Sequence, residues 1–187
     1  MGNKMFCFQC EQTAGCTGCM GNAGVCGKDS TTAALQDELT GALIGLAKSC
    51  GSNPKTDNTD RIIIEGLFTT ITNVNFNNET LKNMIDRVHK EKNIISPDCS
   101  VCQSRCGNTD DYDMENLWKE SEEIGAFKNT ILMVICQTAA KLYHADQTEE
   151  SETVKLLFRA LRMISFEGWD VAGLIPVMVE LGKAGRM

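Results

Sequence analysis

The residues of this chain most able to do chemistry are its ten cysteines, which are spread unevenly over 187 residues. Five lie within twenty residues near the N-terminus, and three lie within eight residues further along. The first group is Cys7, Cys10, Cys16, Cys19 and Cys26; the second is Cys99, Cys102 and Cys106; Cys50 and Cys136 stand alone. No apolar signal-peptide core follows Met1, so the sequence predicts a cytoplasmic protein. In that reducing compartment, clustered cysteines indicate metal binding or redox chemistry rather than disulfides.

The first cysteine group has four possible interpretations: disulfides, a thioredoxin-like redox site, a zinc site or an iron–sulfur cluster. Disulfides are disfavoured by the compartment, and a thioredoxin-like site needs its Cys-x-x-Cys pair between a strand and a helix, whereas nothing strand-like precedes Cys7. Zinc stays open because Cys7–Cys10 and Cys16–Cys19 are two metal-binding pairs, although the five residues between them are few for a zinc ribbon or finger. An iron–sulfur cluster fits best, since its ligands surround a compact core and the interspersed glycines allow tight turns around it.

Several stretches of the sequence together resemble the N-terminus of the hybrid-cluster proteins. They are CFQCEQTAG at 7–15, Gly18-Cys19, GVCGKD at 24–29 and AALQDELTGALIGLA at 33–47. The similarity continues through GLFTTITNVNF at 66–76 and the stretch 128–145. This family is also called the prismane family. Its members are commonly described as hydroxylamine reductases and are distantly related to nickel carbon monoxide dehydrogenases. The resemblance covers only the N-terminal helical domain of the family.

The resemblance implies a set of cluster ligands. They are Cys7, Cys10, Cys19 and Cys26, which leaves Cys16 as an extra cysteine. The implied cofactor is a [4Fe-4S] cluster, with a [2Fe-2S] cluster as the alternative because the spacing between the third and fourth ligands varies in the family. The resemblance also implies that such proteins hold their hybrid cluster further along the chain, through one histidine, two glutamates and four cysteines. Nothing in these 187 residues matches that second ligand set.

The second cysteine group does not match the hybrid-cluster pattern. Its spacing, Cys99-x-x-Cys102-x-x-x-Cys106, would let three thiolates bind three corners of a second iron–sulfur cluster. The candidates for a fourth ligand are Cys16, Cys50 and Cys136. Without one of them, the fourth iron would stay open to a small ligand. Zinc with a remote fourth ligand is the alternative.

The rest of the chain has helical periodicity and no sustained strand alternation, which predicts an all-α fold. Six helices are expected: one capped by Asp29 or Ser30 and stopped by Gly51, one starting at Asn58 or Thr59, one capped by Asn78, one near 120–145, one near 150–165 and one following Asp170. The second cysteine group separates these helices into two sets of three.

This arrangement predicts two three-helix bundles with an N-terminal cysteine-rich cluster-binding loop. The expected segments are 1–28 for the cluster-binding loop, 29–95 for the first bundle, 96–113 for the second cysteine loop and its metal site, and 114–187 for the second bundle. We expect them to form one compact unit.

Several single residues have simpler structural explanations. Cys50 and Cys136 fall on apolar helix faces, where a buried free cysteine is the expected role. His89 lies among charged residues and is expected to face solvent, whereas His144 near a helix end is expected to cap or pack. The acidic run at 110–113 is expected to form a solvated turn and a helix cap, because the spacing of a calcium loop is absent.

The charge balance limits the partners of the chain. Its 18 basic and 25 acidic residues give a net charge of −7 without a basic patch, which argues against nucleic acid and anionic membranes. The longest uncharged apolar run, 131–136, is too short to cross a bilayer. A redox partner protein with a cationic face is expected. The sequence leaves a homo-oligomer open.

These features predict an iron–sulfur protein that transfers electrons, with an oxygen-labile cluster of the kind that suits an anaerobe. The alternative is a hydroxylamine or nitric oxide reductase, which would act at an open second cluster or together with a partner chain that supplies the catalytic domains. The second alternative is a structural zinc protein or a redox sensor. Elemental analysis of anaerobically prepared protein distinguishes these alternatives.

Overall fold

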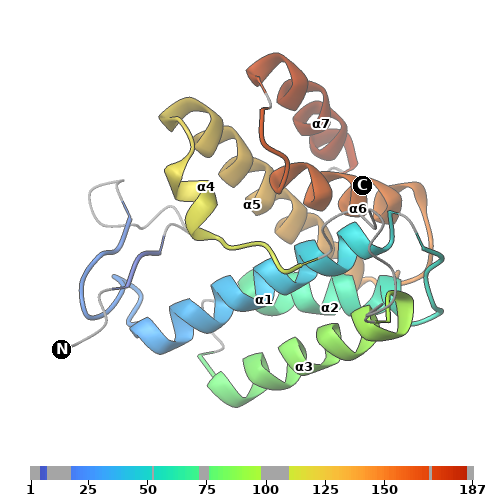
Figure 1. The fold of residues 1–187 in the computed structure, drawn as a ribbon, viewed down its shortest axis with the longest axis horizontal. Coiled ribbons are helices and arrows are strands. Elements are labelled where there is room, and N and C mark those ends of the chain that lie inside the picture. Colours follow the sequence, from blue (N-terminus) through green and yellow to red (C-terminus); the bar gives the residue numbers. More distant parts are fainter. Residues whose placement is uncertain are drawn as a thin grey trace.

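A computed structural model describes residues 5–7, 18–51, 53–71, 76–97, 110–168 and 170–184. Within these ranges the chain forms seven helices, and its only β-structure is two isolated bridges. The helices are α1 (Ser30–Ser49), α2 (Thr59–Ile71), α3 (Asn78–Ile95), α4 (Glu115–Lys119), α5 (Glu122–His144), α6 (Glu152–Ile164) and α7 (Val171–Ala184) (Figure 1). The predicted all-α class is confirmed for this part of the chain. The short helix α4 was not predicted.

Side chains at the helix N-termini explain where several helices begin. Asp29 caps α1, since its carboxylate accepts a hydrogen bond from the backbone N–H of Thr32 at 2.7 Å. For α3 the predicted cap is wrong by one position: Asn77 accepts hydrogen bonds from the backbone at Glu79 and Thr80, and Asn78 is the first helical residue. Each cap satisfies N–H groups that the first helical turn leaves without a partner.

The helices pack as two mutually contacting sets that share one core. Helices α1, α2 and α3 contact one another in the lower half of Figure 1, and α5, α6 and α7 contact one another above them. Contacts of α2 with α5 and of α1 with α6 join the two sets. A single apolar cluster runs through both sets, including the fully buried Leu43, Ile63, Ile135 and Leu161. Because this core is continuous, the division into two separate bundles stays a prediction.

The segment before α4 crosses α1 at Gly41. The backbone N–H of Tyr112 donates a hydrogen bond to the Gly41 carbonyl at 3.1 Å. A Cβ atom at Gly41 would lie 2.2 Å from the carbonyl oxygen of Tyr112, closer than any real contact. Glycine is therefore what lets the two backbones approach, and the approach fixes residues 110–114 against the middle of α1.

Within the described ranges, no helix is both long and apolar enough to cross a lipid bilayer.

Candidate metal centre

Two of the predicted cluster ligands, Cys7 and Cys19, are paired through their backbones. The N–H of Cys7 donates to the carbonyl of Cys19 at 3.1 Å, and the N–H of Cys19 donates back at 2.8 Å, which makes an isolated antiparallel bridge. Residues directly opposite each other in such a pair place their side chains on the same face. Both cysteines are buried and form a small apolar cluster with Met5 and Ala33. The pairing therefore brings together two thiols that are far apart in the sequence.

A third predicted ligand, Cys26, sits on a tight turn that leads into α1. The N–H of Gly24 donates to the Lys28 carbonyl at 2.7 Å, and the N–H of Gly27 donates to the Gly24 carbonyl at 2.9 Å. Gly27 has φ +84°, a left-handed conformation that costs glycine little and other residues more. The turn therefore holds Cys26, which is partly buried, two residues before the buried Lys28.

The structure does not bring all of the predicted ligands together. The remaining cysteine candidates, Cys10, Cys16, Cys99, Cys102 and Cys106, lie outside the described residues. Among the residues that are described, no three Cys, His, Asp or Glu side chains form a metal-binding group. Cys26 is therefore not assembled with the Cys7–Cys19 pair into a three-thiol site in this structure.

The two isolated cysteines are partly buried free thiols. Cys50 is the C-cap residue of α1, and the sulfur of Cys136 in α5 lies 3.5 Å from the hydroxyl of Thr70. Burial raises the pKa of each thiol to about 11. Both thiols are therefore protonated at neutral pH, and a role for either as a fourth ligand of a second site stays a prediction.

A buried lysine lies beside the Cys7 sulfur. Lys28 is 1% exposed, and its Nζ lies 3.7 Å from the Sγ of Cys7 and donates to the Oε1 of Gln36. Gln36 is fully buried on α1, and its Nε2 has no hydrogen-bond partner among the residues that the structure describes. Neither Lys28 nor Gln36 was predicted from the sequence as part of a site. The available signal was a glutamine inside the apolar stretch 33–47, next to the buried Leu35.

An iron–sulfur cluster fits the donor chemistry of these residues. Thiolates are the usual ligands of such clusters, and a charged lysine in a buried site is stabilised by a nearby negative charge. A buried amide nitrogen without an acceptor among the described residues, as in Gln36, leaves one donor beside the cysteine pair available to a further group. The residues that would hold the cluster are the paired cysteines together with Cys26 and a fourth cysteine.

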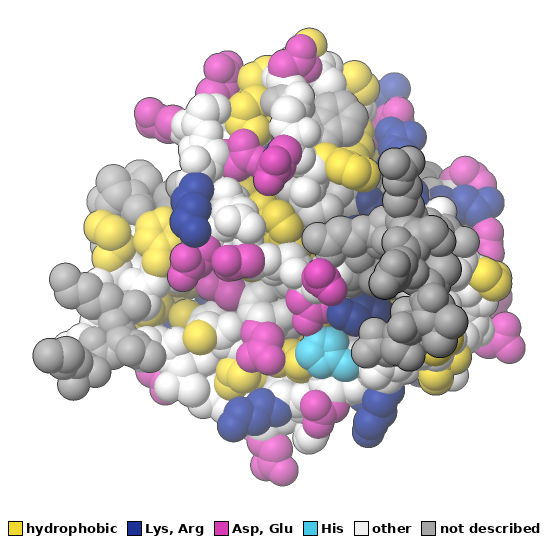
Figure 2. All heavy atoms as spheres, viewed as in Figure 1, with side chains coloured by type: hydrophobic (Ala, Val, Ile, Leu, Met, Phe, Trp, Pro, Cys, Tyr) yellow, Lys and Arg dark blue, Asp and Glu magenta, His cyan; other side chains and the backbone are white. Residues whose placement is uncertain are grey.

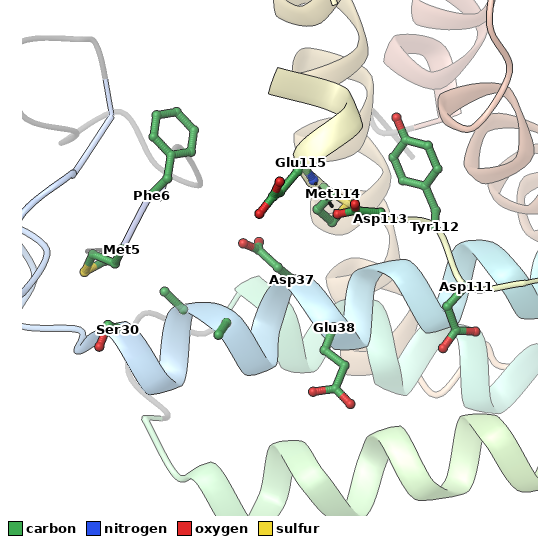
Figure 3. Close-up of a pocket in the computed structure, with 12 residues that line it drawn as sticks. Met5, Phe6, Ser30, Asp37, Glu38, Asp111, Tyr112, Asp113, Met114 and Glu115 are labelled. Carbon is green, nitrogen blue, oxygen red and sulfur yellow. Dashed lines mark hydrogen bonds between the residues drawn. The ribbon is translucent and has the colours of Figure 1, made fainter. Parts of the chain in front are cut away.

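An acidic cleft of about 590 Å³ adjoins the cysteine pair (Figure 3). Its lining includes Met5 and Phe6 from the N-terminal segment, the first turns of α1, and residues 111–115. Among the described residues, five carboxylates line the cleft and no lysine or arginine does: Asp37, Glu38, Asp111, Asp113 and Glu115. In Figure 3 Asp37 and Glu115 point toward one another from opposite walls, and Figure 2 shows acidic side chains gathered over the middle of this face.

Burial makes Asp37 the unusual carboxyl group of the cleft. It raises the pKa of Asp37 to about 7, while the positive charge of Lys28 opposes the shift. At neutral pH this carboxyl group is therefore close to half protonated. Asp37 was not singled out from the sequence, because its burial arises only where the segment at 111–115 covers α1.

The two histidines and the acidic run have mainly structural roles. His89 was expected to face solvent, and its side chain is 37% exposed. Its Nε2 also lies 2.7 Å from a carboxylate oxygen of Asp111, and Lys92 donates to the same carboxylate at 2.5 Å. Asp113 accepts a hydrogen bond from the backbone of Glu115 at the start of α4. His144 ends α5 and packs edge-on against the ring of Phe68, with ring centroids 5.1 Å apart.

The comparisons with known proteins place the chain in a family of redox metalloproteins. The chain belongs to the Prismane/CO dehydrogenase family, whose sequence model matches residues 5–186. It is 32% identical over 200 residues to a hydroxylamine reductase of Methanococcus vannielii, covering 96% of this chain and 37% of that protein. It is also 32% identical over 208 residues to a hydroxylamine reductase of Caldanaerobacter subterraneus, covering 97% and 37% of the two chains.

A shorter match has higher identity. A hydroxylamine reductase of Acidiphilium cryptum is 39% identical over 113 residues, which cover 56% of this chain and 20% of that protein. The chain thus spans about 37% of the length of the two relatives that match it nearly end to end. The predicted family is confirmed, and this coverage fits the N-terminal domain that the sequence resemblance implied.

Proposed function

We propose that this chain is an iron–sulfur redox protein that transfers electrons through a [4Fe-4S] cluster held by Cys7, Cys10, Cys19 and Cys26. The observation that carries the proposal is the backbone pairing of Cys7 with Cys19, which places two buried thiols on one face. Membership of the Prismane/CO dehydrogenase family supports redox metal chemistry. When bound, such a cluster accepts and releases electrons at a potential set by its surroundings.

The chain's own residues have distinct tasks in this proposal. The cysteines bind, and the turn closed by Gly24 and Gly27 presents Cys26 next to α1. Met5 and Ala33 pack against the paired cysteines and exclude water from one side of them. Water exclusion matters because a cluster exposed to solvent and oxygen is more easily lost.

A redox partner protein with a cationic face is the proposed electron donor or acceptor. The supporting observation is that Met5 and Phe6, which directly precede Cys7, also line the cleft, and that the charged groups lining it in the described part of the chain are all acidic. Opposite charges raise the rate of encounter more than the final affinity. Electron exchange with such a partner should therefore slow as the ionic strength rises.

Elemental analysis and spectroscopy of the anaerobically purified chain test the proposal. A [4Fe-4S] protein should contain about four iron and four sulfide atoms per chain, and a [2Fe-2S] protein about half as many. If the second cysteine group also binds a cluster, the content should be about twice as high. Zinc without sulfide would replace the proposal with a structural zinc protein. Iron that is bound but does not cycle between oxidised and reduced states would contradict electron transfer.

A second candidate is reduction of hydroxylamine, the reaction for which the curated relatives are named. That reaction needs a metal atom with a free position for the substrate, which a cluster bound by four cysteines lacks. In this chain the remaining candidate for such a substrate-binding metal atom is the open fourth iron of a second cluster at Cys99, Cys102 and Cys106. A partner chain that supplies the catalytic site is the other route.

A further inference from the structure

In the described part of the chain, Lys28 is one of two lysines that are almost completely buried, and the two differ in their surroundings. Lys128 is also 1% exposed, and its Nζ contacts the Glu120 carboxylate at 2.5 Å and the Phe166 carbonyl at 2.8 Å. The Nζ of Lys28 lies 3.7 Å from a sulfur, the Sγ of Cys7, and donates to the amide oxygen of Gln36, and its positive charge also acts on the Asp37 carboxyl group. A buried ammonium group directed at a cysteine sulfur suits a sulfur that carries negative charge.

The fold holds the Lys28 ammonium group in place from both sides. On one side, the left-handed Gly27 ends the Cys26 turn and Asp29 begins α1, so the Lys28 backbone lies between a closed turn and a capped helix. On the other side, the fully buried Gln36 accepts a hydrogen bond from Nζ. Little rotational freedom is left to the long side chain, and its charged end stays beside the Cys7 sulfur.

From this geometry we propose that Lys28 is a positioning residue that raises the reduction potential of the N-terminal cluster by donating an N–H···S hydrogen bond to the Cys7 thiolate. The inference rests on the proposed function, because it needs Cys7 to be a cluster ligand. Reduction adds negative charge to a cluster and its ligands. A fixed positive donor at a ligand sulfur therefore stabilises the reduced state more than the oxidised state. The interaction is strong because the site is buried and poorly screened.

The test is a redox titration of the full chain carrying Lys28→Met, monitored by visible absorption and electron paramagnetic resonance under anaerobic conditions. Methionine retains an unbranched apolar side chain and removes the charge and the donor. We expect wild-type iron and sulfide contents, together with a ratio of reduced to oxidised cluster at least tenfold lower at a fixed solution potential. For a one-electron couple a tenfold change corresponds to about 59 mV.

Three further variants separate this role from a general effect of charge or folding. Lys183→Met removes an exposed lysine of α7 and should leave the ratio unchanged. Lys28→Arg keeps a charged donor and should shift the ratio much less than Lys28→Met. Gln36→Met removes the acceptor that holds Nζ and should shift the ratio in the same direction as Lys28→Met, by a smaller factor.

The outcomes distinguish failure of this inference from failure of the proposed function. If wild-type protein contains no iron and sulfide, the proposed function is wrong and the inference falls with it. If Lys28→Met carries a complete cluster with the wild-type ratio of reduced to oxidised cluster, the proposed function stands. Lys28 then does not raise the reduction potential, and the inference alone is overturned. If Lys28→Met cannot assemble a cluster, Gln36→Met decides, and a wild-type ratio in that variant overturns the inference.

Discussion

The carbonyl of Gly41 accepts a hydrogen bond from the backbone N–H of Tyr112 at 3.1 Å, across 71 positions of sequence. The contact joins the middle of α1 to the segment that leads into α4. It also sets the wall of the acidic cleft, because Tyr112 and its neighbours line that cleft. One missing Cβ atom at Gly41 therefore determines how closely residues 111–115 cover the surroundings of Asp37.

Gly41→Ala is expected to destabilise the protein. By helix propensity alone, alanine in the middle of α1 would be more stable than glycine by about 0.5–1 kcal/mol. The added Cβ atom would instead lie 2.2 Å from the Tyr112 carbonyl oxygen, so the two backbones must separate. Overpacking of this kind costs about 1–3 kcal/mol, which should appear as a lower free energy of unfolding in urea titrations.

The matched control is Gly182→Ala in α7. Apart from its chain neighbours and the backbone of its own helix, no atom of the described residues lies within 4 Å of a Cβ atom built at Gly182. Helix propensity alone should therefore act, and the free energy of unfolding should stay equal or rise. Equal stability of Gly41→Ala and wild type would mean that the segment at 111–115 moves away from α1 at no cost.

Substitution of any of the four proposed cluster ligands should remove the cluster, whereas substitution of the extra cysteine, Cys16, should not. Cys19→Ser is expected to lose cluster iron and visible absorbance, since Cys19 is paired with Cys7 in the structure. Cys16→Ser is expected to retain both. Cys136→Ser serves as the control for loss of a thiol far along the chain, in α5. Full absorbance in Cys19→Ser combined with loss in Cys16→Ser would point to a different set of four ligands.

Asp37 should make the stability of the protein fall as the pH rises from mildly acidic to neutral. Its pKa in the folded protein is about 7, against an ordinary value of 3.8, so between these values the folded state binds more protons than the unfolded state. Stability is lost across that interval and is level above it. At about 1.4 kcal/mol per pKa unit, a half-buried group should lose about 1–3 kcal/mol between pH 5 and pH 8.

Urea titrations at pH 5 and pH 8 measure this loss. The Asp37→Asn variant should lose less stability over the same interval, by the amount that Asp37 contributes. Glu38→Gln, at the exposed neighbouring position, should behave like wild type. If Asp37→Asn and wild type show the same dependence on pH, the burial of this carboxyl group does not influence its protonation.

The purified chain is expected to show no appreciable turnover of hydroxylamine with an artificial electron donor, while its cluster still cycles between oxidised and reduced states. A cluster bound by four cysteines delivers electrons but offers no free position to a substrate. Turnover that disappears in Cys102→Ser and survives in Cys7→Ser would contradict this expectation. It would make the second cysteine group a catalytic centre.

The sequence by itself determined the features that depend on neighbouring residues. Apolar residues at helical spacing predicted the long helices, because helix periodicity is local, and Asp29 was recognisable as a cap because it acts on the N–H group three residues later. The same locality explains a small error, since Asn77 and Asn78 are equally good caps and only the geometry of the chain entering α3 distinguishes them. The family was recognisable from short motifs around the cysteines.

Only the tertiary structure decided which of these elements meet. Periodicity shows that a helix has an apolar face but not which helix covers it, so the close approach of Gly41 to Tyr112 and the pairing of His89 with Asp111 had no sequence signal. Lys28 reaches Cys7 across 21 positions because a turn and a capped helix fix it there. Burial of a charged group depends on the sum of such long-range contacts. For that reason the burial of Lys28 beside Cys7 and the raised pKa of Asp37 emerged only once the chain was folded.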